Sequence, residues 1–223
     1  MRWHWKREIF PLSIIALLII LSFYFYPRLP EIIPSHFDLH GKPDKFAPKT
    51  NTVILMPALM VGLYPLLTFI PLIDPFWRKI QKKYTLLLLF RDFILLFFLF
   101  FYILVLIAAK RGSLPPQALG LGLGFLFILL GNYLPKLPRN FFFGLRSPWT
   151  LASEVVWRKT HILGGWLFVA GGVLMVLLSF SKIGLPVIIF TILVVIVIFT
   201  TIVYPLLLYK KLQRREETKV PDL

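Results

Sequence analysis

The chain has 223 residues, of which 58% are hydrophobic and 16% are charged, and its formal net charge is +15. A soluble domain usually has about 25% charged residues, so this composition excludes an ordinary soluble globular protein. The absence of cysteine excludes a disulfide framework, an iron–sulfur site and a thiol nucleophile, and we expect no cofactor. We therefore predict an all-α helical bundle that crosses the cell membrane several times.

Six apolar segments are long enough to cross a bilayer, which takes about 20 residues per helix. They cover residues 9–26, 53–73, 86–109, 115–134, 162–180 and 184–208. The first follows a basic N-terminus, as in a signal peptide, but no small-residue cleavage site follows it. We interpret it as a retained helix and expect three units, residues 1–73, 74–134 and 135–223. Pro57 and Pro65 predict a bend in the second helix.

The distribution of basic residues predicts the orientation. With the N-terminus inside, the inner loops and tails hold 17 Lys and Arg residues, and the outer loops hold 7. Cytoplasmic loops carry such an excess, so both termini should be cytoplasmic. Basic residues on the inner side can face the anionic lipid headgroups of the bilayer, which is sufficient to explain the positive net charge. We therefore expect no direct nucleic-acid partner.

Two features within the spans predict helix contacts. Gly120 and Gly124 have the spacing of small residues that lets membrane helices approach closely. A nucleotide-binding loop is the rival interpretation, but no strand precedes these glycines and no lysine follows them. In the third span, we expect Arg91 to extend towards the membrane surface and Asp92 to pair with a neighbouring helix.

The outer loop, residues 27–52, contains alternating polar residues that share one face of an extended strand. They are His36, Asp38 and His40, and they form a candidate zinc site in which Asp44 or water would be the fourth ligand. Gly41 and the Pro43-Asp44 pair indicate a turn. The alternatives are a polar loop at headgroup level and direct binding of an external ligand.

The inner loop, residues 135–161, contains a predicted amphipathic helix at the membrane surface. Ser147 is a favourable N-cap, and Pro148 suits the first helical position. Apolar residues recur at helical spacing, whereas charged residues face elsewhere; the two sets are Trp149, Ala152, Val156 and Trp157, and Glu154, Arg158 and Lys159. We expect the tryptophans at headgroup depth, with Phe141, Phe142 and Phe143 entering the bilayer edge.

The charged residues of this loop permit two interpretations. Glu154 is expected to pair with Arg146, Arg158 or Arg139, because a carboxylate at headgroup depth is costly when alone. The whole segment then either positions the fifth span or presents a cytoplasmic surface to another protein. Few ionisable residues lie at mid-membrane depth, which disfavours an ion-coupled transporter.

The two loops resemble those of the SdpI family of bacterial membrane proteins. The outer stretch "IPSHFDLHGKPDKF" is similar to the family's N-terminal domain of unknown function at His36, Gly41 and Asp44. The inner stretch matches the family's loop at Gly131, Asn132, Pro135, Lys136, Asn140, Gly144, Arg146, Pro148, Trp149, Thr150, Leu151, Glu154, Trp157, Lys159, Thr160, His161 and Gly164. It departs from the pattern at Pro138-Arg139, Ser147 and Ile162.

The resemblance implies a non-enzymatic immunity or signalling protein that senses or neutralises a secreted antimicrobial peptide. It also implies a cytoplasmic repressor protein as a possible partner. The alternatives are a metal-dependent membrane enzyme that uses the outer loop, and a small transporter. No catalytic residue is predicted. The candidate ligand- and partner-binding residues are His36, Asp38, His40, Gly41, Asp44, Asn132, Lys136, Asn140, Arg146, Trp149, Glu154, Trp157 and His161.

Overall fold

The chain folds as a bundle of membrane-spanning helices. The computed structural model describes residues 5–37, 43–115, 117–181 and 185–217. In this part of the chain, six helical segments are long and apolar enough to cross a membrane: Ile9–Arg28, Lys49–Ile73, Trp77–Arg111, Ala118–Lys136, Glu154–Leu178 and Val187–Arg215. The predicted all-α class is confirmed, and the protein is a multi-pass membrane protein.

The N-terminal half contains three of these spans and a small hairpin. Its helices are α1 (Ile9–Phe25), α2 (Lys49–Phe69), the short α3 (Trp77–Ile80) and α4 (Tyr84–Arg111). Between α1 and α2, the strands β1 (Ile32–Phe37) and β2 (Pro43–Pro48) pair in antiparallel orientation. Gly112 ends α4 with a φ of 77°, a left-handed conformation that glycine adopts without strain.

The C-terminal half contains the other three spans. Its helices are α5 (Ala118–Tyr133), α6 (Pro148–Ala152), α7 (Glu154–Leu178), α8 (Leu185–Ile198) and α9 (Tyr204–Glu217). A π-helical turn, Phe199–Val203, joins α8 to α9. Pro205 follows that turn and cannot donate to the carbonyl group four residues earlier, which is a physical reason for the wider turn.

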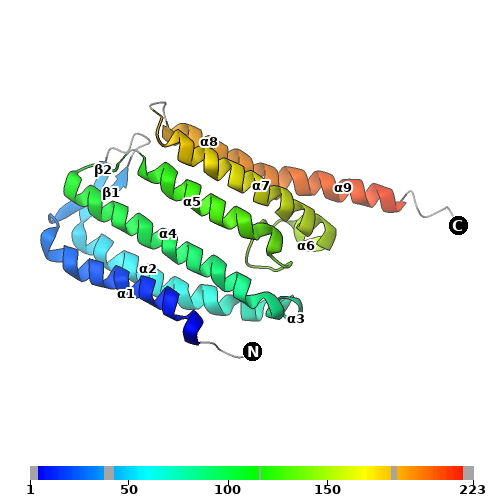
Figure 1. The fold of residues 1–223 in the computed structure, drawn as a ribbon, viewed down its shortest axis with the longest axis horizontal. Helices are drawn as coiled ribbons and strands as arrows, with labels where there is room; N and C mark the ends of the chain where they lie inside the picture. Colours follow the sequence, from blue (N-terminus) through cyan, green and yellow to red (C-terminus); the bar gives the residue numbers. More distant parts are fainter. Residues whose placement is uncertain (1–4, 38–42, 116, 182–184, 218–223) are drawn as a thin grey trace.

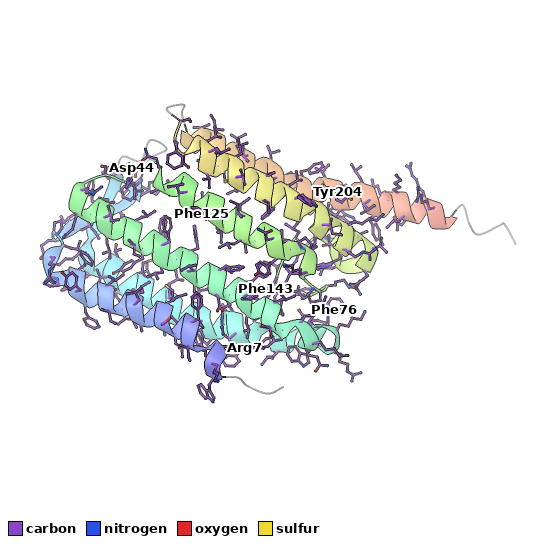
Figure 2. The ribbon with its side chains drawn as sticks, viewed as in Figure 1. Arg7, Asp44, Phe76, Phe125, Phe143 and Tyr204 are labelled. Atoms are coloured by element: carbon purple, nitrogen blue, oxygen red, sulfur yellow. The ribbon has the colours of Figure 1, made fainter. Side chains whose placement is uncertain are left out.

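The hairpin and the inner loop lie at opposite ends of the bundle (Figure 1). The strands lie at one end, and α3 and α6 lie at the other, where α9 extends beyond the neighbouring helices. The labelled side chains of Asp44 and Phe76 mark these two ends in Figure 2. The order of the spans is therefore as predicted, while the direction of the bundle across the membrane stays a prediction.

The contact between α5 and α7 depends on glycines from both helices. A Cβ atom on Gly124 would lie 2.7 Å from the carbonyl oxygen of Gly172, and one on Gly172 would lie 2.6 Å from that of Gly124. Gly131 and Gly165 have the same reciprocal relation at 2.8 Å. A Cβ atom on Gly120 would meet Ser179 and Ile189. The predicted helix contact at Gly120 and Gly124 is confirmed.

Candidate functional site

The outer hairpin brings two of the predicted binding residues together. The Nδ1 atom of His36 lies 2.6 Å from Oδ1 of Asp44, so the two strands are linked by a hydrogen bond between side chains. These side chains remain 60% and 43% exposed. The other predicted residues of this loop, Asp38, His40 and Gly41, lie outside the described residues. The extended backbone predicted at His36 is confirmed as part of β1, whereas Pro43 and Asp44 lie in β2 rather than in the predicted turn. The metal or ligand site of this loop stays a prediction.

At the opposite end, residues 137–161 form a compact structure that we call the inner unit. Asn140 lies at its centre and is fully buried. Its side-chain nitrogen donates to the carbonyl oxygens of Pro138 and Phe143, and its side-chain oxygen accepts from the backbone N–H groups of Phe142 and Phe143. A single amide therefore satisfies four backbone groups and fixes the path of the loop.

Trp157 and His161 connect this loop to the first turns of α7. The indole N–H of Trp157 donates to the carbonyl oxygen of Leu137 at 3.0 Å. The indole ring of Trp157 stacks on the imidazole ring of His161, with centroids 3.9 Å apart. Nε2 of His161 accepts from the N–H of Leu145 at 3.0 Å, and its Nδ1 lies 2.9 Å from the carbonyl oxygen of Trp157. These partners define a neutral imidazole with its proton on Nδ1.

Gly144 is required beside this histidine. Its φ is 100°, and a Cβ atom would lie 2.5 Å from Nε2 of His161. The backbone therefore approaches the imidazole more closely than any other residue would allow. Trp157 is almost fully buried, so its ring packs within the protein rather than against lipid; Trp149 is half-buried, and the depth of both rings in the membrane stays a prediction.

The predicted amphipathic helix is two helices. Ser147 caps α6 as expected, in a capping box with Thr150. The helix ends at Ala152 because Ser153 is extended, with φ −131° and ψ 125°, and the Ser153 side chain accepts from the N–H of Val156 to begin α7. The fifth span consequently starts at Glu154 rather than at residue 162.

Four of the five charged residues of the inner unit are exposed, whereas the side chain of Arg139 is only 15% exposed. Arg139 pairs with Glu154 at 3.2 Å, which selects one of the three predicted partners. Arg146 instead donates to the carbonyl oxygen of Phe141 at 2.8 Å. Arg158 and Lys159 are exposed, as predicted.

Two further predicted site residues lie just before the inner unit: Asn132 is near the end of α5, and Lys136 ends the 3-10 turn that follows α5. Asn132 is exposed and donates to the carbonyl oxygen of Ile128 in its own helix. Lys136 is exposed, with its ammonium group 4.5 Å from the centre of the Tyr133 ring. Neither side chain contributes to the hydrogen-bond network around Asn140.

The three phenylalanines of the loop have different environments. Phe143 is buried and packs against Phe90 of α4, with ring centroids 6.4 Å apart. Phe142 is half-buried and Phe141 is 48% exposed. The expectation that all three enter the bilayer edge is therefore wrong for Phe143, which joins the protein core.

Asp74 is a functional candidate that the sequence analysis missed. It is buried, and its two carboxylate oxygens accept from the N–H groups of Phe76 and Phe141, each at 2.7 Å. It thereby attaches the inner unit to the segment that joins α2 to α4. The available signal was a lone acidic residue in an otherwise basic inner loop.

A second missed feature is a buried charge cluster at the same end of α1, α2 and α4. Arg91 is fully buried, so the expectation that it extends to the membrane surface is wrong. Its guanidinium group bonds to Glu8 at 2.8 Å, to Thr68 at 2.9 Å and to Asp92 on its own helix at 2.9 Å. Tyr64 donates to the same Glu8 carboxylate at 2.8 Å.

Among the described residues, no group of three or more His, Asp or Glu side chains could hold a metal ion. At mid-membrane depth, the groove between α4 and α5 is lined by apolar residues, including Phe93, Phe97 and Phe125.

Comparison with known proteins connects both ends of the molecule to one family. Residues 136–208 match the SdpI/YfhL protein family, and residues 13–61 match a domain of unknown function (DUF1648). Immunity protein SdpI from Bacillus subtilis (strain 168) is 30% identical over 176 residues, which cover 78% of this chain and 82% of that protein. No solved structure gives a significant match. The matched regions contain the hairpin and the inner unit, and the chain belongs to the SdpI/YfhL family.

Proposed function

We propose that this chain is a non-enzymatic membrane immunity protein that protects its cell from an external antimicrobial peptide. The observation that carries the proposal is the 30% identity, over most of both chains, to a protein named Immunity protein SdpI. The structure supports it with two separate surfaces at opposite ends of one helical bundle. Such an arrangement suits a protein that meets a peptide on one side and a second partner on the other.

The inner unit supports a signalling role within this proposal. Its backbone is fixed by Asn140, Trp157 and His161, whereas Arg158 and Lys159 are exposed on its surface. A rigid surface with exposed cations favours a partner with acidic groups. We therefore assign to the inner unit the binding of a cytoplasmic repressor protein, and to the hairpin the sensing of the peptide.

The protective role is tested by expressing the chain in a bacterium that is sensitive to membrane-active peptides and challenging it with a panel of such peptides. We expect survival with at least one peptide, and loss of survival in the double variant His36→Ala/Asp44→Ala. Lys45→Ala, an exposed position on the same hairpin, is the matched control. Sensitivity to every peptide, with normal amounts of protein in the membrane, would refute the proposal.

The orientation requires its own test, because the hairpin must face the peptide. Single cysteines replacing Asp44 and Glu154 are labelled in intact cells with a reagent that does not cross the membrane. We expect labelling at position 44 alone, and labelling at position 154 only after the cells are opened. Labelling of both positions in intact cells would contradict the six-span arrangement.

The metal-dependent enzyme remains the alternative for the outer loop. Metal analysis of the purified chain separates the two proposals. Protein that protects cells and contains no stoichiometric zinc supports the immunity proposal. Stoichiometric zinc that is lost in the variant His36→Ala would favour the enzyme.

A further inference from the structure

A groove between α1 and α4 opens at the hairpin end of the bundle, far from the inner unit. It has a volume of about 450 Å³. Its walls are apolar and come from Leu21 and Phe25 of α1 and from Ile103, Leu106 and Ile107 of α4, and Lys110 and Arg111 lie at its end. The groove thus combines an apolar channel with two cations at one end.

The position of the groove in the membrane follows from the length of α4. This helix has 28 residues, which corresponds to about 42 Å at 1.5 Å per residue. The hydrocarbon core is only about 30 Å thick, so the last turn of α4 reaches the headgroups. Ile103 lies seven residues before Lys110, roughly 10 Å deeper along the helix, at the depth of acyl chains.

The two cations are held at the mouth of the groove. The ammonium group of Lys110 lies 5.3 Å from the centre of the Phe25 ring, on the opposite wall. Lys110 and Arg111 are exposed, and no carboxylate in the described part of the chain forms an ion pair with either. Basic residues also interact favourably with a helix C-terminus, but that interaction does not explain the apolar groove below them.

We propose that this groove binds an anionic phospholipid. One acyl chain lies along Leu21, Ile103 and Ile107, and the phosphate group contacts Lys110 and Arg111. The two cations at the mouth favour an anionic headgroup, and the apolar walls, which extend to the depth of the acyl chains, favour a lipid chain. The phospholipid comes from the leaflet on the hairpin side. The groove residues that would bind it are not among those assigned to the immunity role, so the two proposals are independent.

The test uses the full chain in detergent, titrated with phosphatidylglycerol or with phosphatidylcholine, and native mass spectrometry counts the bound lipids. We expect preferential binding of phosphatidylglycerol. Lys110→Gln/Arg111→Gln should weaken it roughly 25-fold, because each basic residue near a membrane surface contributes a factor of about five. The matched control is Lys82→Gln/Lys83→Gln, two exposed cations just before the other end of α4, which should leave binding unchanged.

Two outcomes would overturn the proposal. Equal weakening in both double variants would mean that the lipid responds only to net charge. Unchanged affinity in Ile107→Trp, which fills the groove and keeps both cations, would mean that no acyl chain occupies it. Weaker binding in that variant, at normal thermal stability, supports the groove as the site.

Discussion

The two halves of the bundle are held together in opposite ways. In the N-terminal half, α1, α2 and α4 meet around the buried Arg91, Glu8 and Asp92, with Tyr64 and Thr68 completing the network. In the C-terminal half, α5 and α7 meet through glycines whose backbones touch. Lipid is as apolar as leucine, so burying apolar surface does not draw membrane helices together; polar bonds and close packing do.

This difference predicts opposite sensitivities. The polar contact fails when a charge is removed, because the remaining charges are left buried without a partner. The glycine contact fails when volume is added, because the two backbones must separate. The comparison is tested by removing a charge from the N-terminal half and by adding volume to the glycine contact of the C-terminal half.

The largest effect is expected for Arg91→Met. Removing one partner of a buried ion pair costs about 3–5 kcal/mol, and here it leaves Glu8 and Asp92 buried without the cation that both contact. We expect the largest drop in melting temperature in detergent for this variant. Lys79→Met, an exposed cation at the same end of the bundle, is the control.

A triple variant sharpens that prediction. Arg91→Met combined with Glu8→Gln and Asp92→Asn removes all three charges, so much of the lost stability should return. If the single and triple variants melt at the same temperature, the cost comes from packing around the guanidinium group and the charge argument is wrong.

The next effect is expected for Gly124→Leu. Its side chain would enter the space occupied by the Gly172 backbone, and overpacking of this kind costs about 1–3 kcal/mol. Gly62→Leu is a matched control, because a Cβ atom at Gly62 on α2 would meet nothing within 4 Å. Leucine favours a helix more than glycine does, so similar losses in both variants would mean that the α5–α7 contact does not determine the change.

The sequence predicted the glycine contact but not the charge cluster, for a physical reason. Gly120 and Gly124 belong to one helix, and their spacing alone places them on a common face. Arg91 and Glu8 are 83 residues apart, and nothing in the local pattern indicates that α1 begins beside the first turns of α4. An arginine near a helix end can equally reach the membrane surface, so burial required knowledge of the packing.

The inner unit shows the same division between local and distant information. Ser147 and Pro148 predicted the start of a helix because capping depends on adjacent residues. The break at Ser153 was missed because the apolar spacing continues through it. The buried places of Trp157 and His161 depend on Leu137 and Leu145, which the chain brings back over α7.

A more local effect is expected for Asn140→Ala, which tests whether polar bonds hold the inner unit together as they hold the N-terminal half. Two N–H groups and two carbonyl groups would lose their partner, and each group that stays buried and unsatisfied costs about 1–3 kcal/mol. We expect faster proteolysis within residues 137–147. The control is Asn132→Ala, which changes an exposed asparagine with one bond to its own helix. Equal rates of proteolysis in the two variants would contradict the central role of Asn140.

The smallest effect on stability is expected for Arg146→Ala. Its side chain is exposed and makes one bond to the carbonyl oxygen of Phe141, so its removal should change the free energy of unfolding by less than about 0.5 kcal/mol. Because the backbone of the inner unit is fixed by other residues, the charge of Arg146 is free to serve a partner.

The measurement for Arg146→Ala is therefore protection of sensitive cells at matched membrane abundance, with Lys82→Ala as an exposed basic control at the same end. Lost protection with an unchanged melting temperature supports a binding surface. Loss of the folded protein in Arg146→Ala would instead make this arginine part of the support for α7. The inner unit would then belong with the charge cluster, as a device that holds helices together, and its assignment as a partner surface would be withdrawn.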